Sequence, residues 1–285
     1  MAVLLTPGKI NLFLDVTSRR ADGYHDIETL FLPIPSLSDR IELSPSTGPG
    51  LSLECASVGV PCDERNLAWR AAEAYFRLAG QMLPSLHIRI DKNLPVAGGM
   101  GGGSSDAAAV LRLLNQQHGL LSDADLRGIA LAIGADVPFF LDPRPACATG
   151  VGEELRPIAK SGKLFLVFAF SAFPIPAAWA YKNRMGHLRG APRPLSGMLA
   201  ALAEGDGEAV AAHVFNGLAP AIRHKFPLLE SVRRDLIAGG CLAAEVSGSG
   251  PTVFGIAPDA AAAEACRAVL IQTGWPASMT VTAEV

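Results

Sequence analysis

The first half of the chain shows hydrophobic periods of both strand and helix. Leu86, Ile88 and Ile90 alternate with polar residues, which predicts a half-buried strand. Before it, apolar positions three and four residues apart predict a helix over residues 66–78, with Asn66 as its cap and Gly80 at its end. The expected buried face of that helix consists of Leu67, Ala71, Ala74, Tyr75 and Leu78.

Other segments of this half follow the same two periods. Residues 9–16 and 27–32 are predicted strands that flank a turn at residues 20–23. Two further helices are predicted, one over residues 105–117 and one from Ser122 to Gly134. The buried face of the second is expected to hold Leu126, Ile129, Ala130 and Ile133.

The second half has a different order of elements. The predicted strands are 163–171, 242–246, 252–256 and 279–285, and the predicted helices are 195–202, 208–214, 227–238 and 259–272. Without its additional helices this order is β-α-β-β-α-β, the ferredoxin-like pattern. The fold class is therefore α+β, with an N-terminal nucleotide-binding α/β domain over residues 1–155 and a C-terminal ferredoxin-like domain over residues 156–285.

Composition and charge exclude several classes of protein. The 285 residues carry a formal net charge of −3 without a long block of Lys or Arg, which argues against a nucleic-acid or membrane-surface partner. The apolar stretch 164–180 is shorter than the roughly 20 residues of a membrane-spanning helix and contains prolines. It is interpreted as a strand followed by a proline-containing loop. The N-terminus has no signal-peptide pattern, so a cytoplasmic protein is expected.

The five cysteines do not indicate a metal site or a disulfide framework. They are scattered, and none forms a Cys-x-x-Cys pair. We therefore expect reduced thiols and no metal bound by the protein.

A dense run of glycines follows the predicted strand 86–90 and leads into a helix. Glycine is costly to order, so such a run favours unusual backbone angles or close approach of a ligand. Free N–H groups at the following helix N-terminus would attract a phosphate, and the serine hydroxyls add donors. The predicted phosphate-binding residues are Pro95, Val96, Ala97, Gly98, Gly99, Met100, Gly101, Gly102, Gly103, Ser104 and Ser105.

The register of the glycines separates this loop from two common phosphate loops. A Walker A loop requires Gly-Lys-Ser/Thr, but Ser104 follows Gly103 directly. A Rossmann loop requires a third glycine in a position that this run does not supply. A flexible hinge stays open as an alternative, although it does not account for the serines or the helix.

Three other short motifs lie before and after the glycine loop in the chain. They are Lys9-Ile-Asn-Leu12 with Asp22-Gly-Tyr-His25, then Gly134-Ala-Asp-Val-Pro-Phe139, then Ser247-Gly-Ser-Gly-Pro251. Together with the glycine loop, these segments resemble the GHMP kinase superfamily, and within it most closely the kinases of 4-diphosphocytidyl-2-C-methyl-D-erythritol. The resemblance implies a two-domain GHMP kinase fold.

The resemblance also implies residue roles and ligands. Lys9 and Asp136 would contact the substrate hydroxyl, the aspartate as base and the lysine as support for the developing charge. Asn11, Tyr24, His25 and Tyr181 would contact the substrate, with Trp179 as an alternative to Tyr181 at the cytosine. ATP is the expected co-substrate, with Mg²⁺ carried mainly by ATP, and the protein is expected to be a monomer or homodimer.

Two alternatives to that assignment remain at the level of sequence. One is another GHMP kinase, of the homoserine or mevalonate type, with a different acceptor pocket. The other is a nucleotide-binding module without activity, which the Lys9 and Asp136 pair disfavours. Read without the resemblance, Lys9 would be an exposed strand residue and Asp136 a turn former.

Overall fold

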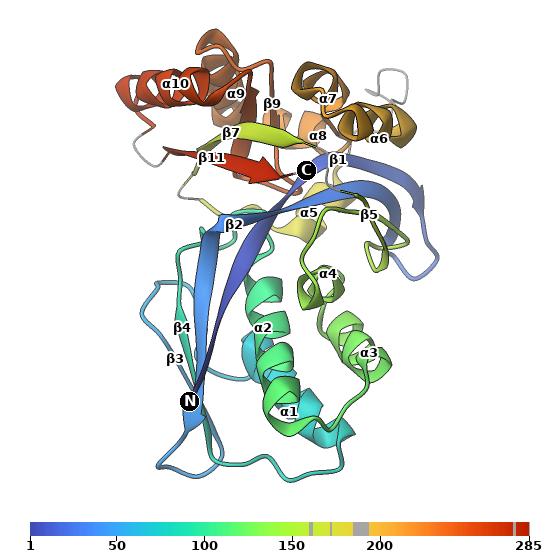
Figure 1. The fold of residues 1–285 in the computed structure, drawn as a ribbon, viewed down its shortest axis with the longest axis vertical. Helices are drawn as coiled ribbons and strands as arrows, with labels where there is room; N and C mark the ends of the chain where they lie inside the picture. The colour runs from blue at the N-terminus through green and yellow to red at the C-terminus, as the bar shows by residue number, and fades with distance from the viewer. Residues whose placement is uncertain (160–161, 172, 185–193, 276–277, 285) are drawn as a thin grey trace. The chain divides into compact units, whose positions relative to one another are not determined.

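The computed structural model describes residues 1–159, 162–171, 173–184, 194–275 and 278–284, and it divides into two compact units (Figure 1). Unit 1 comprises Met1–Gly8, Pro35–Val96 and Gly101–Pro143. Unit 2 comprises Lys9–Ile34, Ala97–Met100 and Arg144–Val285. Strands β1 (Ala2–Arg19) and β2 (His25–Pro45) each contribute residues to both units.

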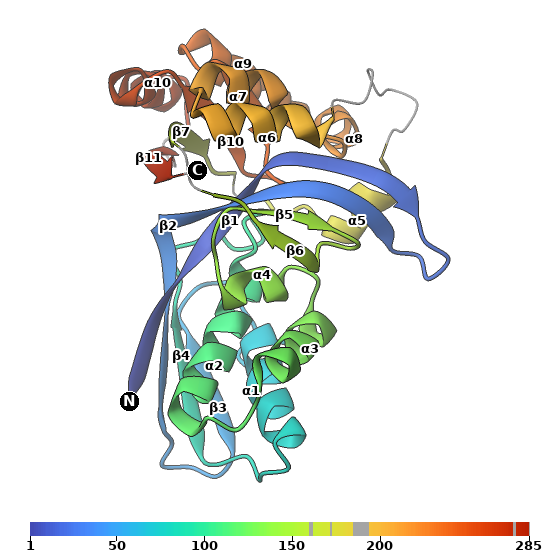
Figure 2. The same cartoon turned by 45° about the vertical axis from the view of Figure 1, so that its right-hand side comes forward.

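Unit 1 is a layer of strands covered by helices. The second half of β2 pairs with β4 (Leu86–Asp91) antiparallel, and β3 (Leu51–Cys55) pairs with β4 in parallel. The covering helices are α1 (Leu67–Leu78), α2 (Gly102–His118), α3 (Asp123–Ile133) and α4 (Val137–Leu141). Both ribbon views place these helices along one face of the strands (Figures 1 and 2).

The first sheet of unit 2 contains residues 9–19 of β1 and residues 25–34 of β2. Phe13 and Leu14 of β1 pair in parallel with β8 (Phe215–Asn216). On the other side, β2 pairs with β5 (Ala146–Thr149), which in turn pairs with β6 (Glu154–Pro157).

The second sheet of unit 2 is antiparallel and has the strand order β11-β7-β10-β9. Its strands are β7 (Lys163–Ala169), β9 (Ala243–Val246), β10 (Val253–Ala257) and β11 (Ser278–Glu284). The helices of unit 2 are α5 (Ala177–Lys182), α6 (Leu195–Glu204), α7 (Gly207–His213), α8 (Ala219–Lys225), α9 (Pro227–Ala238) and α10 (Ala260–Gln272). Taken in chain order, β7-α9-β9-β10-α10-β11 is the predicted ferredoxin-like pattern, which is confirmed.

The capping signals of the sequence are confirmed. The Asn66 side chain accepts the N–H of Ala68 at the start of α1, and Ser122 forms a capping box with Asp125 at the start of α3. Burial of α3 follows the predicted face, but in α1 the prediction is partly wrong. There Leu78 is 52% exposed, while Ala68 and Phe76 are buried instead.

Several element boundaries also differ from the prediction. Both N-terminal strands extend further than expected, and α2 begins at Gly102, within the glycine run. The proline-containing segment after β7 is not wholly a loop, because helix α5 starts at Ala177 directly after Pro176. Elements β3, β5, β6, β8, α4 and α8 were not predicted.

Within the described ranges, no helix is both long and apolar enough to cross a membrane. All five cysteines are free thiols. The domain boundary expected at residue 156 stays a prediction.

Candidate active site

The side chain of Lys9 is fixed inside unit 2 by a chain of hydrogen bonds. Lys9 is only 5% exposed, and its Nζ donates to Asn11 Oδ1 over 2.8 Å, because residues two apart on a strand share one face. The Asn11 amide donates to Thr29 Oγ1 over 2.8 Å, and that hydroxyl donates to the Phe13 carbonyl over 2.6 Å. The chain orients the Asn11 oxygen toward the ammonium group. Lys9 is therefore a buried, positioned cation and not the exposed edge-strand charge considered above.

The glycine turn at Ser247–Pro251 lies against the same two side chains. A Cβ atom at Gly248 would lie 3.1 Å from Asn11 Oδ1 and 3.6 Å from Lys9 Nζ. The Asn216 amide holds this turn by donating to the carbonyls of Val246 and Gly248, each over 2.8 Å. Glycine thus allows the backbone to approach the Lys9 ammonium group closely.

Residues 97–100 of the glycine loop are bound to this turn by the backbone. The Thr252 N–H donates to the Gly98 carbonyl over 3.2 Å, and the Ser247 hydroxyl donates to the Gly99 carbonyl over 3.3 Å. The Lys9 N–H donates to the Met100 carbonyl over 2.9 Å, and the Met100 side chain is buried. Strand, turn and loop therefore form one connected layer within unit 2.

We expect Gly99→Ala to destabilise this layer. Gly99 has a φ of 77°, and an added Cβ would lie 2.6 Å from the Ser247 carbonyl oxygen and 2.8 Å from that of Gly250. Backbone strain of this kind costs about 1–3 kcal/mol, and the clash adds to it. Gly80→Ala is the matched control, because Gly80 has a φ of 64° and nothing within 4 Å of its added Cβ. Urea unfolding should show the larger loss for Gly99→Ala, and equal losses would contradict the packing argument.

The remaining loop residues form the N-terminus of α2 in unit 1. Gly101 is the cap, with a φ of 71°, and no described side chain bonds to the N–H groups of this helix end. Such an uncapped end attracts anions. Of the two serines, Ser105 is fully buried and its hydroxyl donates to the Pro7 carbonyl over 2.6 Å, so Ser104 has the more available hydroxyl.

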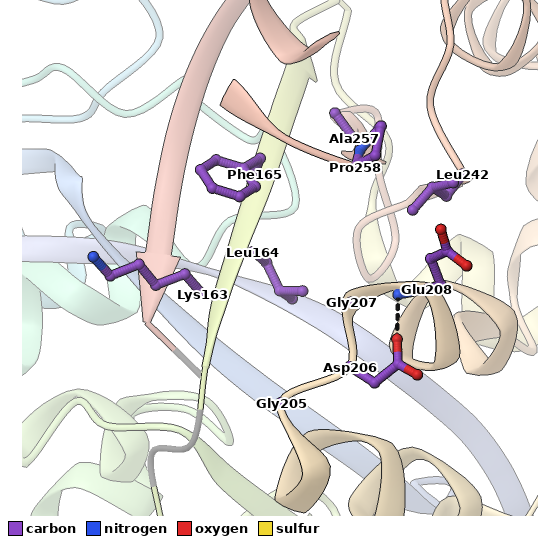
Figure 3. Close-up of a pocket in the computed structure, with 10 residues that line it drawn as sticks. All are labelled: Lys163, Leu164, Phe165, Gly205, Asp206, Gly207, Glu208, Leu242, Ala257 and Pro258. Atoms are coloured by element: carbon purple, nitrogen blue, oxygen red, sulfur yellow. Dashed lines mark hydrogen bonds between the residues drawn. The ribbon is translucent and has the colours of Figure 1, made fainter. Parts of the chain in front are cut away.

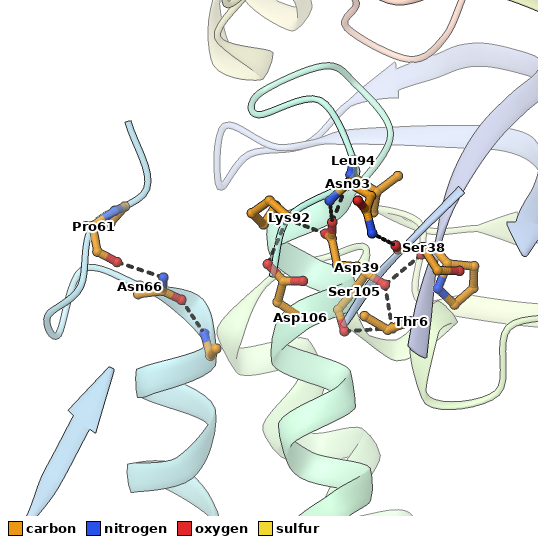
Figure 4. A network of polar contacts seen from close by, with 12 residues as sticks. Thr6, Ser38, Asp39, Pro61, Asn66, Lys92, Asn93, Leu94, Ser105 and Asp106 are labelled. Carbon is orange, nitrogen blue, oxygen red and sulfur yellow. Dashed lines mark hydrogen bonds and ion pairs between the residues drawn. The ribbon is translucent and has the colours of Figure 1, made fainter. Parts of the chain in front are cut away.

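A buried cluster of charged side chains lies beside the first turn of this helix (Figure 4). Lys92 donates to both Asp39 and Asp106, the second over 2.8 Å. Burial lowers the pKa of Lys92, but the two carboxylates outweigh it and raise the pKa overall. Burial raises the pKa of Asp106 to about 7, which the Asp39 charge reinforces and the Lys92 charge opposes.

Asp136 lies in unit 1, at the residue that precedes α4. Its backbone is helical, with φ −83° and ψ −15°, and its side chain makes no capping bond. The side chain is half-buried. Its pairing with Lys9, which belongs to unit 2, stays a prediction.

The structure brings two of the predicted aromatic residues together in unit 2. The rings of His25 and Tyr181 stack with centroids 5.6 Å apart. Trp179 instead packs edge-on against Phe226, with ring centroids 5.5 Å apart. Tyr24 is 62% exposed. Of the two aromatic candidates on α5, Tyr181 is therefore the one placed beside His25.

The pKa of His25 is lowered, by burial first and then by the positive charges of Arg184 and Arg19. The neutral imidazole is favoured near pH 7. A neutral ring offers one N–H donor and one nitrogen acceptor.

A cavity of about 420 Å³ elsewhere in unit 2 contains none of the predicted site residues (Figure 3). Its lining residues are Lys163, Leu164, Phe165, Gly205, Asp206, Gly207, Glu208, Leu242, Ala257 and Pro258. Asp206 is used there as the cap of α7, accepting the N–H groups of Glu208 and Ala209.

Several residues that hold the site were not predicted from the sequence. They are Thr6, Thr29, Asp39, Lys92 and Asp106, together with the bonds made by Asn216. Asp106 follows the serines of the glycine loop directly and Lys92 follows the strand before it, so proximity to the loop was the available signal. Asp39 and Thr29 had no such signal.

Comparison with known families supports the class that this fold and loop indicate. Residues 66–142 match the model of the GHMP kinases N terminal domain, and residues 198–275 match that of the GHMP kinases C terminal. A curated relative from Pelobacter propionicus is 40% identical over 98% of each chain. The chain therefore belongs to the GHMP kinase family.

The relatives with this similarity share one name. The Pelobacter propionicus protein and one from Geobacter sulfurreducens, 38% identical over 95% of each chain, are both called 4-diphosphocytidyl-2-C-methyl-D-erythritol kinase. A crystal structure of 4-(cytidine 5'-diphospho)-2C-methyl-D-erythritol kinase covers all of both chains at 37% identity and a TM-score of 0.81. A homoserine kinase from Cytophaga hutchinsonii has a TM-score of 0.78 at 16% identity, over 99% of this chain and 94% of its own, and so shares the fold.

Proposed function

We propose that this chain transfers the γ-phosphoryl group of ATP to the 2-hydroxyl of 4-diphosphocytidyl-2-C-methyl-D-erythritol. This reaction belongs to non-mevalonate isoprenoid precursor biosynthesis, and we place the enzyme in the cytoplasm. The observation that carries the proposal is the identity of about 40% with named kinases of this substrate over nearly the whole chain. ATP is the phosphate donor of GHMP kinases in general.

Phosphoryl transfer depends mainly on positioning and on stabilising charge, because the protein forms no covalent intermediate with the phosphoryl group. We assign the phosphates of ATP to the glycine loop, where the uncapped N-terminus of α2 offers N–H donors. Gly98, Gly99 and Met100 are held by backbone bonds to Thr252 and Lys9, and to the Ser247 hydroxyl, so contacts within the protein fix the path of this part of the loop.

We assign the hydroxyl chemistry to Lys9 and Asp136. Asp136 would accept the proton of the attacking hydroxyl, and the Lys9 ammonium would stabilise the negative charge that develops on its oxygen. The bond from Lys9 to Asn11 Oδ1 holds the ammonium group in place beside the turn at Ser247–Pro251.

Mg²⁺ is expected to enter with ATP. The described residues contain no group of three or more His, Cys, Asp or Glu side chains spaced to hold a metal ion. Phosphate oxygens and water would then supply most of its ligands, as is usual for this ion.

The cytosine base is assigned to the aromatic residues of unit 2. His25 and Tyr181 supply a stacked pair of rings, and the imidazole of His25 is neutral. Tyr24, which directly precedes His25 in the chain, is exposed. Base stacking on aromatic rings is worth about 1–3 kcal/mol in nucleic-acid complexes.

We expect Tyr24→Ala to raise KM for the cytidyl substrate by about 5–100-fold with a much smaller change in kcat, because stacking is remote from the reacting hydroxyl. Tyr24→Phe is the matched control, since it keeps the ring and should keep KM near that of the unaltered protein. Steady-state kinetics with ATP held at saturation measure both constants. An unchanged KM in the alanine variant would contradict the role of Tyr24.

The alternative is another GHMP kinase with a different alcohol as acceptor. The homoserine kinase noted above and a mevalonate kinase of L. major, 19% identical, share only the fold at these identities. To decide between them, candidate alcohols are incubated with ATP and the purified protein. The phosphorylated products are then identified by mass spectrometry. Turnover of homoserine or mevalonate without turnover of the cytidyl substrate would reject the proposal.

A further inference from the structure

The charge cluster of unit 1 has an uneven distribution of hydrogen bonds (Figure 4). Asp39 accepts from Lys92 and also from the N–H groups of Asn93 and Leu94, over 2.7 and 2.8 Å. Asp106 accepts from Lys92 through Oδ2, but its buried Oδ1 has no hydrogen-bond partner among the residues that the structure describes. Asp39 therefore has three donors, whereas Asp106 has one.

The same cluster has an excess of negative charge if both carboxyl groups are ionised. The side chains of Lys92, Asp39 and Asp106 are 5%, 0% and 4% exposed, so one ammonium group would face two carboxylates out of contact with water. An uncompensated buried charge is strongly unfavourable. A single proton on Asp106 makes the cluster neutral, and the direction of its pKa, raised mainly by burial, agrees.

The ionisable groups that act on Asp106 are confined to this cluster. Lys92 directly follows β4, and Asp39 lies on β2. Among the helices packed on α2, α4 carries no ionisable residue, and the charged residues of α1 and α3 are exposed. Those exposed residues are Arg70, Glu73 and Arg77 on α1, and Asp123, Asp125 and Arg127 on α3.

The cluster lies directly beside the first turn of α2. A Cβ atom at Gly102 would lie 3.1 Å from Lys92 Nζ and 3.6 Å from Asp39 Oδ2. Asp106 is one turn further along the same helix. A full negative charge at this position would compete with an anionic ligand for the positive end of the helix.

We propose that Asp106 is a positioning residue that carries a proton when nucleotide phosphates bind at the N-terminus of α2. The neutral carboxyl group keeps its bond to Lys92, which also bonds to Asp39, and so connects α2 to β2 without repelling the phosphates. The inference rests on the proposed function, because it assumes that phosphates occupy this helix end. As the pH rises through about 7 the proton is lost, and nucleotide affinity falls.

Calorimetric binding of ADP with Mg²⁺ from pH 6 to pH 8.5, in two buffers of different ionisation enthalpy, tests the proposal. If only the protonated form binds well, the affinity of the unaltered protein should fall roughly fivefold between pH 7 and pH 8, with uptake of a proton on binding. Asp106→Asn is the matched variant, because its amide oxygen can accept from Lys92 as Oδ2 does and its side chain carries no charge at any pH. It should lack this fall and this uptake, apart from the titration of ADP itself.

Equal pH dependence and equal proton uptake in the two proteins would overturn the proposal. If both proteins still phosphorylate the substrate in that case, the proposed function is retained. If neither protein binds ADP at any pH, the phosphate site itself is rejected. Infrared spectra of the unaltered protein, with isotope-labelled aspartate, give a second measurement that needs no variant. A protonated carboxyl band that disappears as the pH rises past 7 supports the proposal, and its absence at pH 6 contradicts it.

Discussion

Replacing Asp136 with asparagine is expected to lower kcat by about 10²–10⁴-fold while ATP affinity stays nearly unchanged. The amide keeps the size of the side chain but cannot accept the proton of the substrate hydroxyl. The proposed ATP site uses backbone groups of the glycine loop, which the substitution does not alter. Single-turnover kinetics with the cytidyl substrate measure the chemical step, and ADP calorimetry measures nucleotide binding.

Asp123→Asn is the control for this experiment. Asp123 is an exposed carboxylate at the start of α3 in the same unit, and the cap of that helix is Ser122. Its substitution should leave kcat within about twofold of the unaltered protein. Full turnover in Asp136→Asn, or an equal loss of ATP affinity, would show that Asp136 is not the base.

The second large effect is expected for Lys92→Met. Methionine fills a similar volume but leaves Asp39 and Asp106 without a cation at a site that is at most 5% exposed. Breaking a buried ion pair by removing one partner costs about 3–5 kcal/mol. Urea unfolding at pH 8 measures the loss, and the defect should be smaller at pH 5. The reason is that without Lys92 the group that lowers the pKa of Asp106 is gone, so protonation at acid pH relieves the unpaired charge.

Two comparisons make this result specific. Lys163→Met removes an exposed lysine and should change the free energy of unfolding by less than about 0.5 kcal/mol. Lys92→Met combined with Asp106→Asn should recover part of the loss, because one of the two unpaired carboxylates is then neutral. A loss in Lys92→Met that does not vary with pH and is not recovered in the double variant would mean that packing, not charge, determines it.

Local signals predicted much of the fold. The caps Asn66 and Ser122 and the alternation at residues 86–90 act within a few residues, so the sequence shows them directly. Elements as short as α4, with five residues, cannot show a helical period, and their formation depends on packing against α2 and α3. The position of strand ends likewise depends on pairing partners far along the chain.

For the candidate site, too, local features could be predicted from the sequence and long-range contacts could not. The glycine loop, Lys9 and Asp136 were identified by motif, and the short-range bond from Lys9 to Asn11 follows from strand geometry. The bonds that hold the site are mostly long-range. Thr6 meets Ser105 across 99 residues, and Lys92 meets Asp39 across 53. No periodic or compositional signal links such pairs in a single sequence.

The passage of β1 and β2 through both units has a consequence for how the chain is made. Unit 1 has all of its residues by Pro143, about halfway through translation. Unit 2 begins at Lys9 but needs residues 144–285, so its N-terminal strands emerge from the ribosome long before β8 can pair with β1. An isolated fragment that begins near residue 156 would lack β1 and β2 entirely. We therefore expect such a fragment, expressed alone, to be unable to complete unit 2.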